Sequence, residues 1–250
     1  MLQFEVALYS DRGGRDYNED ACGHWQSDRQ LCCVLADGAG GHGGGDIASR
    51  LAVREAIGRF AQAPAHDAAD LAALVVEVNH AVLAQQLPGT PQQNMHSTVV
   101  CLVLDLHEHS ACWSHAGDSR LYWFRGGRLR ERTRDHSLVQ GLIDAGMVTE
   151  ADVRRHPQRS ELRSALGVGA ELLEVGSGQG RDQVEPGDVF LLCTDGLWEY
   201  VDDSVMEAAL AGSQAAQDWL DRLTEAVRHG ARDKASHDNF TALTVWAHAA

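Results

Sequence analysis

Short apolar runs separated by polar or glycine-rich segments recur along this 250-residue chain, and such runs are typical of strands buried within a sheet. The predicted strands are VALYS (6–10), LCCVLA (31–36), STVVCLVLDL (97–106), SACWSHAGD (110–118), RLYWF (120–124), RLRERT (128–133), VFLLC (189–193) and NFTALTVWA (239–247). Gly126 and Gly127 join two of these strands and predict a hairpin there.

Apolar residues repeat at the spacing of a helix in four other segments. The first predicted helix begins at Asp46 and is broken by Ala63–Ala65, and the second has Asp67 as its N-cap. Two more helices are predicted at 204–210 and 213–229. Helices therefore alternate with runs of antiparallel strands, which predicts one α+β domain with sheets packed together and helices outside.

Carboxylates stand where several predicted strands begin or end: Glu19, Asp20, Asp37, Asp118, Asp195 and Asp238. Any one of them is explained by a turn, because Asp, Asn and Gly favour turns. As a set they are harder to dismiss, since strand ends in a layered domain converge at a rim. Carboxylates gathered there repel one another unless cations neutralise them, and all-oxygen ligation suits Mg²⁺ or Mn²⁺.

The segment VLADGAGGHGGG, Val34–Gly45, places six glycines among the eight residues that follow Asp37. Glycine lets the backbone come very close to a neighbouring group. A carbonyl at Gly38 could ligate a metal without steric obstruction. We therefore expect Asp37 to bridge two ions, with the glycines leaving room around them.

Five motifs, RDYNED, VLADGAGGH, AGDSRLY, CTDGLWE and HDNFTALTV, resemble in order and spacing those of the metal-dependent protein Ser/Thr phosphatases, the PP2C or PPM family. The chain is most similar in length to stand-alone bacterial members. The resemblance implies a four-layer αββα sandwich, in which two antiparallel sheets pack face to face and are flanked by helix pairs. It also implies a single domain over residues 1–250, with a variable flap at about 135–169.

The resemblance implies a ligand set for two Mn²⁺ or Mg²⁺ ions, with room for a third. Asp37 would bridge two ions. Asp195 and Asp238 would hold the first ion, and Glu19 with the Gly38 carbonyl would hold the second, partly through water. Asp20 would lie in the outer shell, and the third site of some members is matched by Asp118, Asp195 and Glu199.

The implied reaction is hydrolysis of phosphoserine and phosphothreonine on proteins. Two divalent ions about 4 Å apart can lower the pKa of a bridging water and clamp phosphate oxygens, so no phosphoenzyme is needed. Arg15 matches the arginine that grips the substrate phosphate, where its forked donors suit two oxygens. The expected partners are phosphorylated proteins, including a Ser/Thr kinase and its substrates.

The chain departs from the family pattern at several positions. Ala39 stands where bacterial members often have Met and animal members have a His proposed as general acid. His42 is a candidate replacement for that acid. His96, Ser236 and His237 stand where glycine is common. These changes affect the expected shape of the loops, but no proposed ligand is lost.

Within the flap segment, Arg154, Arg155 and Arg159 could contact acidic phosphopeptides. A solvated helix face explains these three arginines at least as well.

Other enzyme classes fit the sequence less well. No cysteine is followed six residues later by arginine, which a cysteine phosphatase needs. The only lysine is Lys234 and no GxxxxGK occurs, so a P-loop enzyme or kinase is disfavoured. A metal-dependent nuclease would need a basic track that this chain lacks. A degenerate phosphatase fold used only for binding is disfavoured by the intact ligand set.

The formal net charge of −15 makes the chain a poor binder of nucleic acid or anionic membranes, and it suits either divalent cations or simple solubility. No stretch is long and apolar enough to cross a bilayer, and the first residues lack the features of a signal peptide. The six cysteines form no CxxC pair and mostly lie in apolar runs, which favours reduced thiols in a cytoplasmic protein. We expect a monomer.

Overall fold

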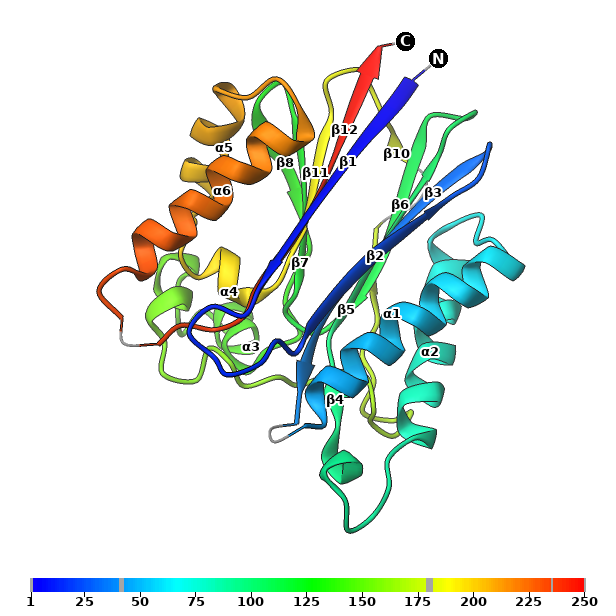
Figure 1. The fold of residues 1–250 in the computed structure, drawn as a ribbon, viewed down its shortest axis with the longest axis vertical. Coiled ribbons are helices and arrows are strands. Elements are labelled where there is room, and N and C mark those ends of the chain that lie inside the picture. The colour runs from blue at the N-terminus through cyan, green and yellow to red at the C-terminus, as the bar shows by residue number, and fades with distance from the viewer. Residues whose placement is uncertain (1, 41–42, 179–181, 235, 250) are drawn as a thin grey trace.

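The computed structural model describes residues 2–40, 43–178, 182–234 and 236–249. Two antiparallel sheets pack face to face, and helices cover the outer side of each sheet (Figure 1). The first sheet has the strand order β1 (Leu2–Asp11), β12 (Phe240–Ala249), β11 (Val189–Cys193), β7 (Arg120–Arg125) and β8 (Arg128–Arg132). Its outer face packs against α5 (Asp203–Ala211) and α6 (Ala216–Ala231).

The second sheet has the order β10 (Asp182–Gln183), β6 (Ser110–Ala116), β5 (Val99–Asp105), β3 (Gln30–Ala39) and β2 (Asp20–Gln26). Two short strands extend it, β4 (His96–Ser97) beside β3 and β9 (Gly176–Ser177) beside β6. The helices α1 (Gly45–Gln62) and α2 (Ala68–Ala84) cover its outer face. The predicted four-layer αββα sandwich is confirmed.

The sandwich explains why the strands appear in the sequence as continuous apolar runs. In β3, Cys32, Val34 and Ala36 face α1 and α2, whereas Leu31, Cys33 and Leu35 face the other sheet. Side chains alternate across a strand, so a strand buried on both faces needs apolar residues at every position. The same alternation holds in β5 and β11.

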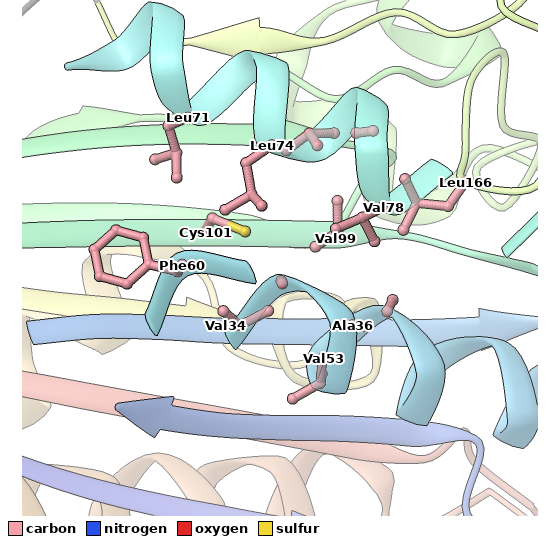
Figure 2. Packing of buried hydrophobic residues seen from close by; sticks show 14 of the residues in the cluster. Val34, Ala36, Val53, Phe60, Leu71, Leu74, Val78, Val99, Cys101 and Leu166 are labelled. Atoms are coloured by element: carbon pink, nitrogen blue, oxygen red, sulfur yellow. The ribbon is translucent and has the colours of Figure 1, made fainter. Parts of the chain in front are cut away.

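The helical layer over the second sheet packs tightly onto these strands. Figure 2 shows Phe60 of α1 and Leu71 of α2 in one buried cluster with Val34 and Cys101 of the sheet. Asp67 is the N-cap of α2 as predicted, and its carboxylate accepts hydrogen bonds from the backbone N–H groups of Ala69 and Asp70.

The strand and helix predictions hold with shifted ends, and some elements had no strong sequence signal. The β1 strand is longer than its apolar run, and β2 carries polar and small residues in a half-exposed strand. The flap segment contains α3 (Leu138–Asp144) and a 3₁₀ turn η2 (Glu150–Arg155). The short helices η1 (Pro91–Asn94) and α4 (Asp195–Trp198) were not predicted.

The α2 helix offers a matched test of this packing. Leu71 is fully buried, whereas Leu83 on the same helix is 37% exposed. We expect Leu71→Ala to lower the free energy of unfolding by about 2–5 kcal/mol, because it leaves a cavity under the helix. Leu83→Ala should change it by less than about 0.5 kcal/mol. Chemical denaturation of both variants measures the difference, and equal losses would contradict the assigned packing.

Candidate metal centre

The carboxylates at the strand ends meet in one pocket, at the end of the sandwich away from the two chain termini (Figure 1). This pocket, the metal pocket below, has a volume of about 170 Å³. Its lining includes Arg15, Glu19, Asp37, Gly38, Asp118, Asp195 and Asp238. Asp20 lies directly opposite Asp37 in the β2–β3 register. The structure therefore brings together the carboxylates that the sequence placed at strand ends.

Backbone contacts fix the position of Asp37 at the end of β3. Its N–H donates to Thr98 Oγ1 at 2.9 Å, and its carbonyl accepts from Ser97 Oγ at 2.9 Å and from Thr98 N–H at 2.8 Å. Thr98 Oγ1 in turn lies 2.7 Å from Ser119 Oγ. The residues after His96 thus hold the Asp37 backbone while leaving its carboxylate turned to the pocket.

Asn239 holds the loop that carries Arg15 and Glu19. Its Oδ1 accepts from Glu19 N–H at 2.8 Å, and its Nδ2 donates to the carbonyls of Arg12 and Tyr17 at 2.8 and 3.0 Å. Sequence reasoning treated Asn239 only as a turn residue beside Asp238. Its place next to a carboxylate at a strand start was the available signal, but the loop it binds lies more than two hundred positions away.

Ser236 and His237 also contact the loop that carries Arg15. Gly14 N–H donates to the His237 carbonyl at 3.0 Å, and Ser236 Oγ donates to the Gly14 carbonyl at 3.1 Å. The loop is therefore tied to the strand end from two sides. Arg15 at its tip donates from Nη2 to Asp238 Oδ2 at 2.7 Å.

The glycines after Asp37 serve close packing of the backbone. A Cβ at Gly38 would collide with the Gly45 carbonyl and lie 2.7 Å from the Glu19 carbonyl. The start of α1 can therefore approach β3, and a Cβ at Gly45 would lie 2.5 Å from Glu19 Oε1. Gly38 also lines the metal pocket, and the expectation that these glycines leave room around ions stays a prediction.

The buried acidic groups resist ionisation in the protein as it stands. Burial, reinforced by neighbouring carboxylates, raises the pKa values of Asp37 and Asp195 well above the usual range. Burial likewise raises the pKa values of Asp20 and Asp118 to about 7. Burial raises the pKa of Glu19 as well, with Asp46 and Asp238 adding to the effect.

The donor set fits hard divalent cations. It consists of carboxylate oxygens and a glycine carbonyl, and two buried oxygens, Glu19 Oε1 and Asp20 Oδ1, have no hydrogen-bond partner among the described residues. Within the described ranges, no group of three His, Cys, Asp or Glu side chains is arranged to hold a metal ion in this structure. Carboxylates that repel one another have no reason to close up without a cation.

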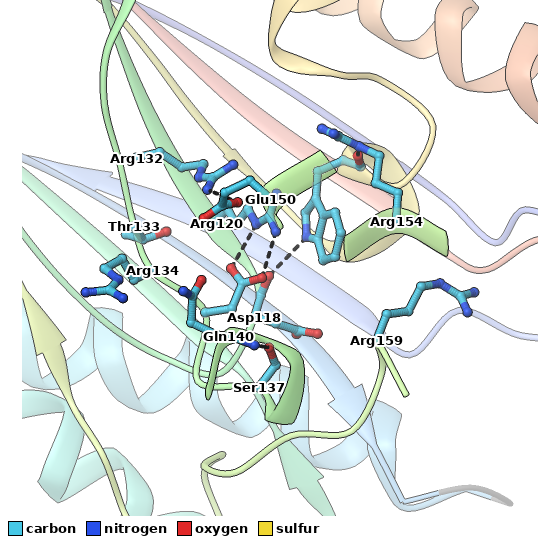
Figure 3. Close-up of polar contacts among 12 residues, drawn as sticks. Asp118, Arg120, Arg132, Thr133, Arg134, Ser137, Gln140, Glu150, Arg154 and Arg159 are labelled. Carbon is cyan, nitrogen blue, oxygen red and sulfur yellow. Dashed lines mark hydrogen bonds and ion pairs between the residues drawn. The ribbon is translucent and has the colours of Figure 1, made fainter. Parts of the chain in front are cut away.

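A buried ionic network stands behind Asp118 (Figure 3). Arg120 makes a forked contact with Asp135, at 2.8 and 2.7 Å, and its guanidinium lies 3.6 Å from the centre of the Trp198 ring. Trp198 Nε1 donates to the Asp118 carbonyl at 3.0 Å. The network therefore fixes the backbone of Asp118 and the α4 helix relative to each other.

Glu199 lies apart from the metal pocket, in a neighbouring pocket that shares Asp195. Its carboxylate is bound by the Arg159 guanidinium, with Nη2 at 3.2 Å from Oε2. The flap residues Ser160 and Leu162 line the metal pocket, and Arg154 Nε donates to the Trp198 carbonyl at 2.8 Å. Arg154 and Arg159 thus have partners inside the molecule, and Arg155 is the exposed one of the three.

The candidate general acid His42 lies outside the described residues. Ala39 lines the metal pocket and offers no proton donor. His96 is the register partner of Ala39 across β3 and β4, and its Nδ1 lies 3.3 Å from the Leu166 carbonyl. Trp113, Trp123 and Trp198 are buried and pack in the core.

One protein-family model and several known proteins match this chain along most of its length. The family model for protein phosphatase 2C matches residues 10–238. The serine/threonine phosphatase stp of Listeria monocytogenes is 32% identical to this chain, with coverage of 94% of this chain and 93% of that protein.

Two solved structures share the whole fold. The serine/threonine phosphatase PstP/Ppp of Mycobacterium tuberculosis is 31% identical, with a TM-score of 0.82 and coverage of 98% of this chain and 99% of that one. The catalytic domain of the phosphatase PstP in complex with two manganese ions is 30% identical, with a TM-score of 0.81 and complete coverage of both chains. Of the helices described in the present chain, none has the length and apolar character to span a membrane.

The raised pKa of Asp118 predicts how the metal-free protein responds to pH. Its carboxyl normally ionises near 3.8 but in the fold at about 7, so the folded state binds the extra proton between these values. Its contribution to the free energy of unfolding is therefore lost as pH rises from about 4 to about 7. Asp118→Asn should remove this loss and gain on the order of 2–4 kcal/mol over wild type between pH 4 and pH 8.

Urea denaturation in EDTA at a series of pH values measures this difference. The exposed Asp28→Asn variant controls for the removal of one negative charge. A difference between Asp118→Asn and wild type that stays constant with pH would contradict the raised pKa.

Proposed function

The chain belongs to the protein phosphatase 2C family of serine/threonine protein phosphatases, and we propose that it hydrolyses phosphoserine and phosphothreonine at a centre of two divalent cations, Mn²⁺ or Mg²⁺. One observation carries this proposal. Carboxylates from distant strand ends share one pocket, where burial and mutual repulsion raise the pKa values of Asp37 and Asp195. Cations would relieve that repulsion.

We propose the ligand set implied by the family motifs. Asp37 would contact both ions, Asp195 and Asp238 would hold one, and Glu19 with the Gly38 carbonyl would hold the other. Asp20 would act from behind Asp37, which it faces across β2 and β3. Its Oδ2 already accepts from Thr194 Oγ1 at 3.0 Å, so it can steady Asp37 without entering the pocket. When bound, two such ions activate a water for in-line attack and neutralise phosphate oxygens, so no phosphoenzyme is required.

Arg15 is the proposed phosphate-binding residue. In the structure its guanidinium neutralises Asp238, at 2.7 Å. Once Asp238 serves as a metal ligand, it no longer needs the arginine, and the forked donors of Arg15 can turn to two phosphate oxygens. Arg15 and Asp238 therefore form a pair that holds the pocket before loading and separates on loading.

A third ion would have Asp118, Asp195 and Glu199 as its ligands, but these three residues do not line one pocket. Asp118 and Asp195 line the same pocket, whereas Glu199 is bound by Arg159 in the neighbouring pocket. Use of Glu199 as a ligand would require that ion pair to open. We propose that Asp118 acts mainly through its effect on the electrostatic potential in the metal pocket. Trp198 holds the Asp118 backbone in place, and Arg120 packs against the Trp198 ring.

We further propose that residues 1–250 act as one phosphatase domain with 135–169 as its variable flap. The substrates would be phosphorylated proteins, among them a Ser/Thr kinase and its targets. None of the six cysteines forms a disulfide, which supports a reducing, cytoplasmic setting. Burial raises the pKa values of Cys32, Cys33, Cys101 and Cys193, so these thiols stay protonated and unreactive. We expect the protein to act as a monomer.

The reaction is tested by phosphate release from phosphothreonine and phosphoserine peptides, with a phosphotyrosine peptide as the control. We expect hydrolysis of the first two to require Mn²⁺ or Mg²⁺ and to be abolished in Asp37→Asn. This variant should keep its fold, because it removes a charge from a repelling cluster. Turnover by Asp37→Asn near the wild-type rate would refute the assigned role.

Arg15→Ala separates phosphate binding from metal binding. Loss of a charge-assisted contact costs roughly 1.5–3 kcal/mol, so kcat/KM should fall about ten- to over a hundredfold at saturating Mn²⁺. Mn²⁺ affinity, measured by calorimetry, should be unchanged or higher because Asp238 loses its competing partner. Arg15→Lys should recover only part of the activity. Wild-type kcat/KM in Arg15→Ala would show that another donor binds the phosphate.

A further inference from the structure

A second pocket of about 300 Å³ opens beside the metal pocket. The two pockets share Arg15, Ser160, Asp195 and Asp238. The second pocket is also lined by Arg159, Glu199, Tyr200, Lys234, Ser236 and His237. A peptide whose phosphorylated residue occupies the metal pocket would therefore have its neighbouring side chains within reach of the second pocket.

The net charge of this second pocket depends on whether cations are bound in the metal pocket. Its carboxylates are Asp195, Glu199 and Asp238, and its full cations are Arg15, Arg159 and Lys234. Arg159 is matched by Glu199, at 3.2 Å. If Asp195 and Asp238 serve as metal ligands, as in the proposed function, the bound ions neutralise their negative charges. Lys234 and Arg15 then remain without a balancing carboxylate in the pocket.

Lys234 differs from the other cations of this region. It is the only lysine in the chain, and it is exposed at the end of α6. Its ammonium lies 4.4 Å from the centre of the Tyr200 ring, a cation–π contact that holds the side chain at the pocket. Among the described residues it makes no ion pair. Most other basic side chains near the centre have a carboxylate partner, including Arg15 and Arg159.

We propose that this second pocket is an anion site in which Lys234 binds an acidic group of the same phosphoprotein, either a carboxylate or a second phosphate close to the residue being dephosphorylated. The proposal rests on the proposed function, because cations at Asp195 and Asp238 are what leave the pocket positive. An ammonium suits this task as a compact charge that accepts carboxylate or phosphate from several directions. Lys234 would then set substrate preference without touching the reacting phosphate.

The first test compares kcat/KM at saturating Mn²⁺ for three sets of phosphothreonine peptides. One set has neutral flanks, one carries a single Asp at each position within three residues of the phosphothreonine, and one carries a second phosphothreonine at those positions. For wild type we expect the best anionic peptide to exceed the neutral one by roughly three- to tenfold, the size of a partly exposed charge contact. Lys234→Gln should bring this ratio close to one, and Lys234→Arg should keep most of it.

The outcomes separate this proposal from the proposed function. No Mn²⁺-dependent hydrolysis of any phosphothreonine peptide by wild type would refute the proposed function itself. Hydrolysis with a ratio near one in wild type, or with a preference that persists in Lys234→Gln, would overturn only the anion site. A larger ratio for the second phosphate than for Asp would identify doubly phosphorylated segments as the preferred source of the anion.

A binding measurement gives a second readout that is independent of turnover. Reductive methylation with a ¹³C reagent labels only Lys234 and the α-amino group, because the chain has no other lysine. Both modified groups keep their positive charge. We expect the Lys234 signal of the Mg²⁺-loaded wild-type protein to shift on addition of the anionic peptide, made with a non-hydrolysable phosphonate in place of the phosphothreonine, and not on addition of the matching neutral peptide. The α-amino signal is the internal control, and an unmoved Lys234 signal would overturn the proposal.

Discussion

The burial of carboxylates from distant strand ends in one pocket is the constraint on which the rest of this structure depends. Asp37, Asp118 and Asp195 lie where burial and repulsion raise their pKa values, so the folded chain carries them at a cost. Three clusters of buried apolar side chains, one between the sheets and one beneath each helical layer, offset that cost. In the proposed function, divalent cations would relieve this repulsion by binding the same carboxylates.

The residues around the rim serve to hold its carboxylates in place. Ser97 and Thr98 fix the backbone of Asp37, and Asn239 fixes the loop of Arg15 and Glu19. Arg120 and Trp198 do the same for Asp118 from behind. Most of these contacts are made to backbone atoms, so they position the acidic side chains without consuming their oxygens, which stay available to ions.

The sequence predicted the features that depend on local pattern. Apolar runs revealed the strands buried on both faces, and acidic residues beside glycine or asparagine revealed the rim. The β2 strand was not predicted because its half-exposed residues do not alternate clearly between apolar and polar. The roles of Asn239 and of the Arg120–Asp135 pair also escaped, because a contact between distant segments leaves no local pattern. The Arg15–Asp238 pair was unexpected, since both residues had been assigned to ligands outside the chain.

Proton release on Mn²⁺ binding tests the central claim most directly. Calorimetric titrations at pH 6.5 in two buffers with different ionisation enthalpies give the number of ions bound and the number of protons released. Carboxyls with raised pKa values must lose their protons to become ligands, so we predict two tightly bound ions with release of at least about one proton. Binding without proton release, or no binding, would contradict the claim that the buried carboxyls at this rim lose protons and become ligands of divalent cations.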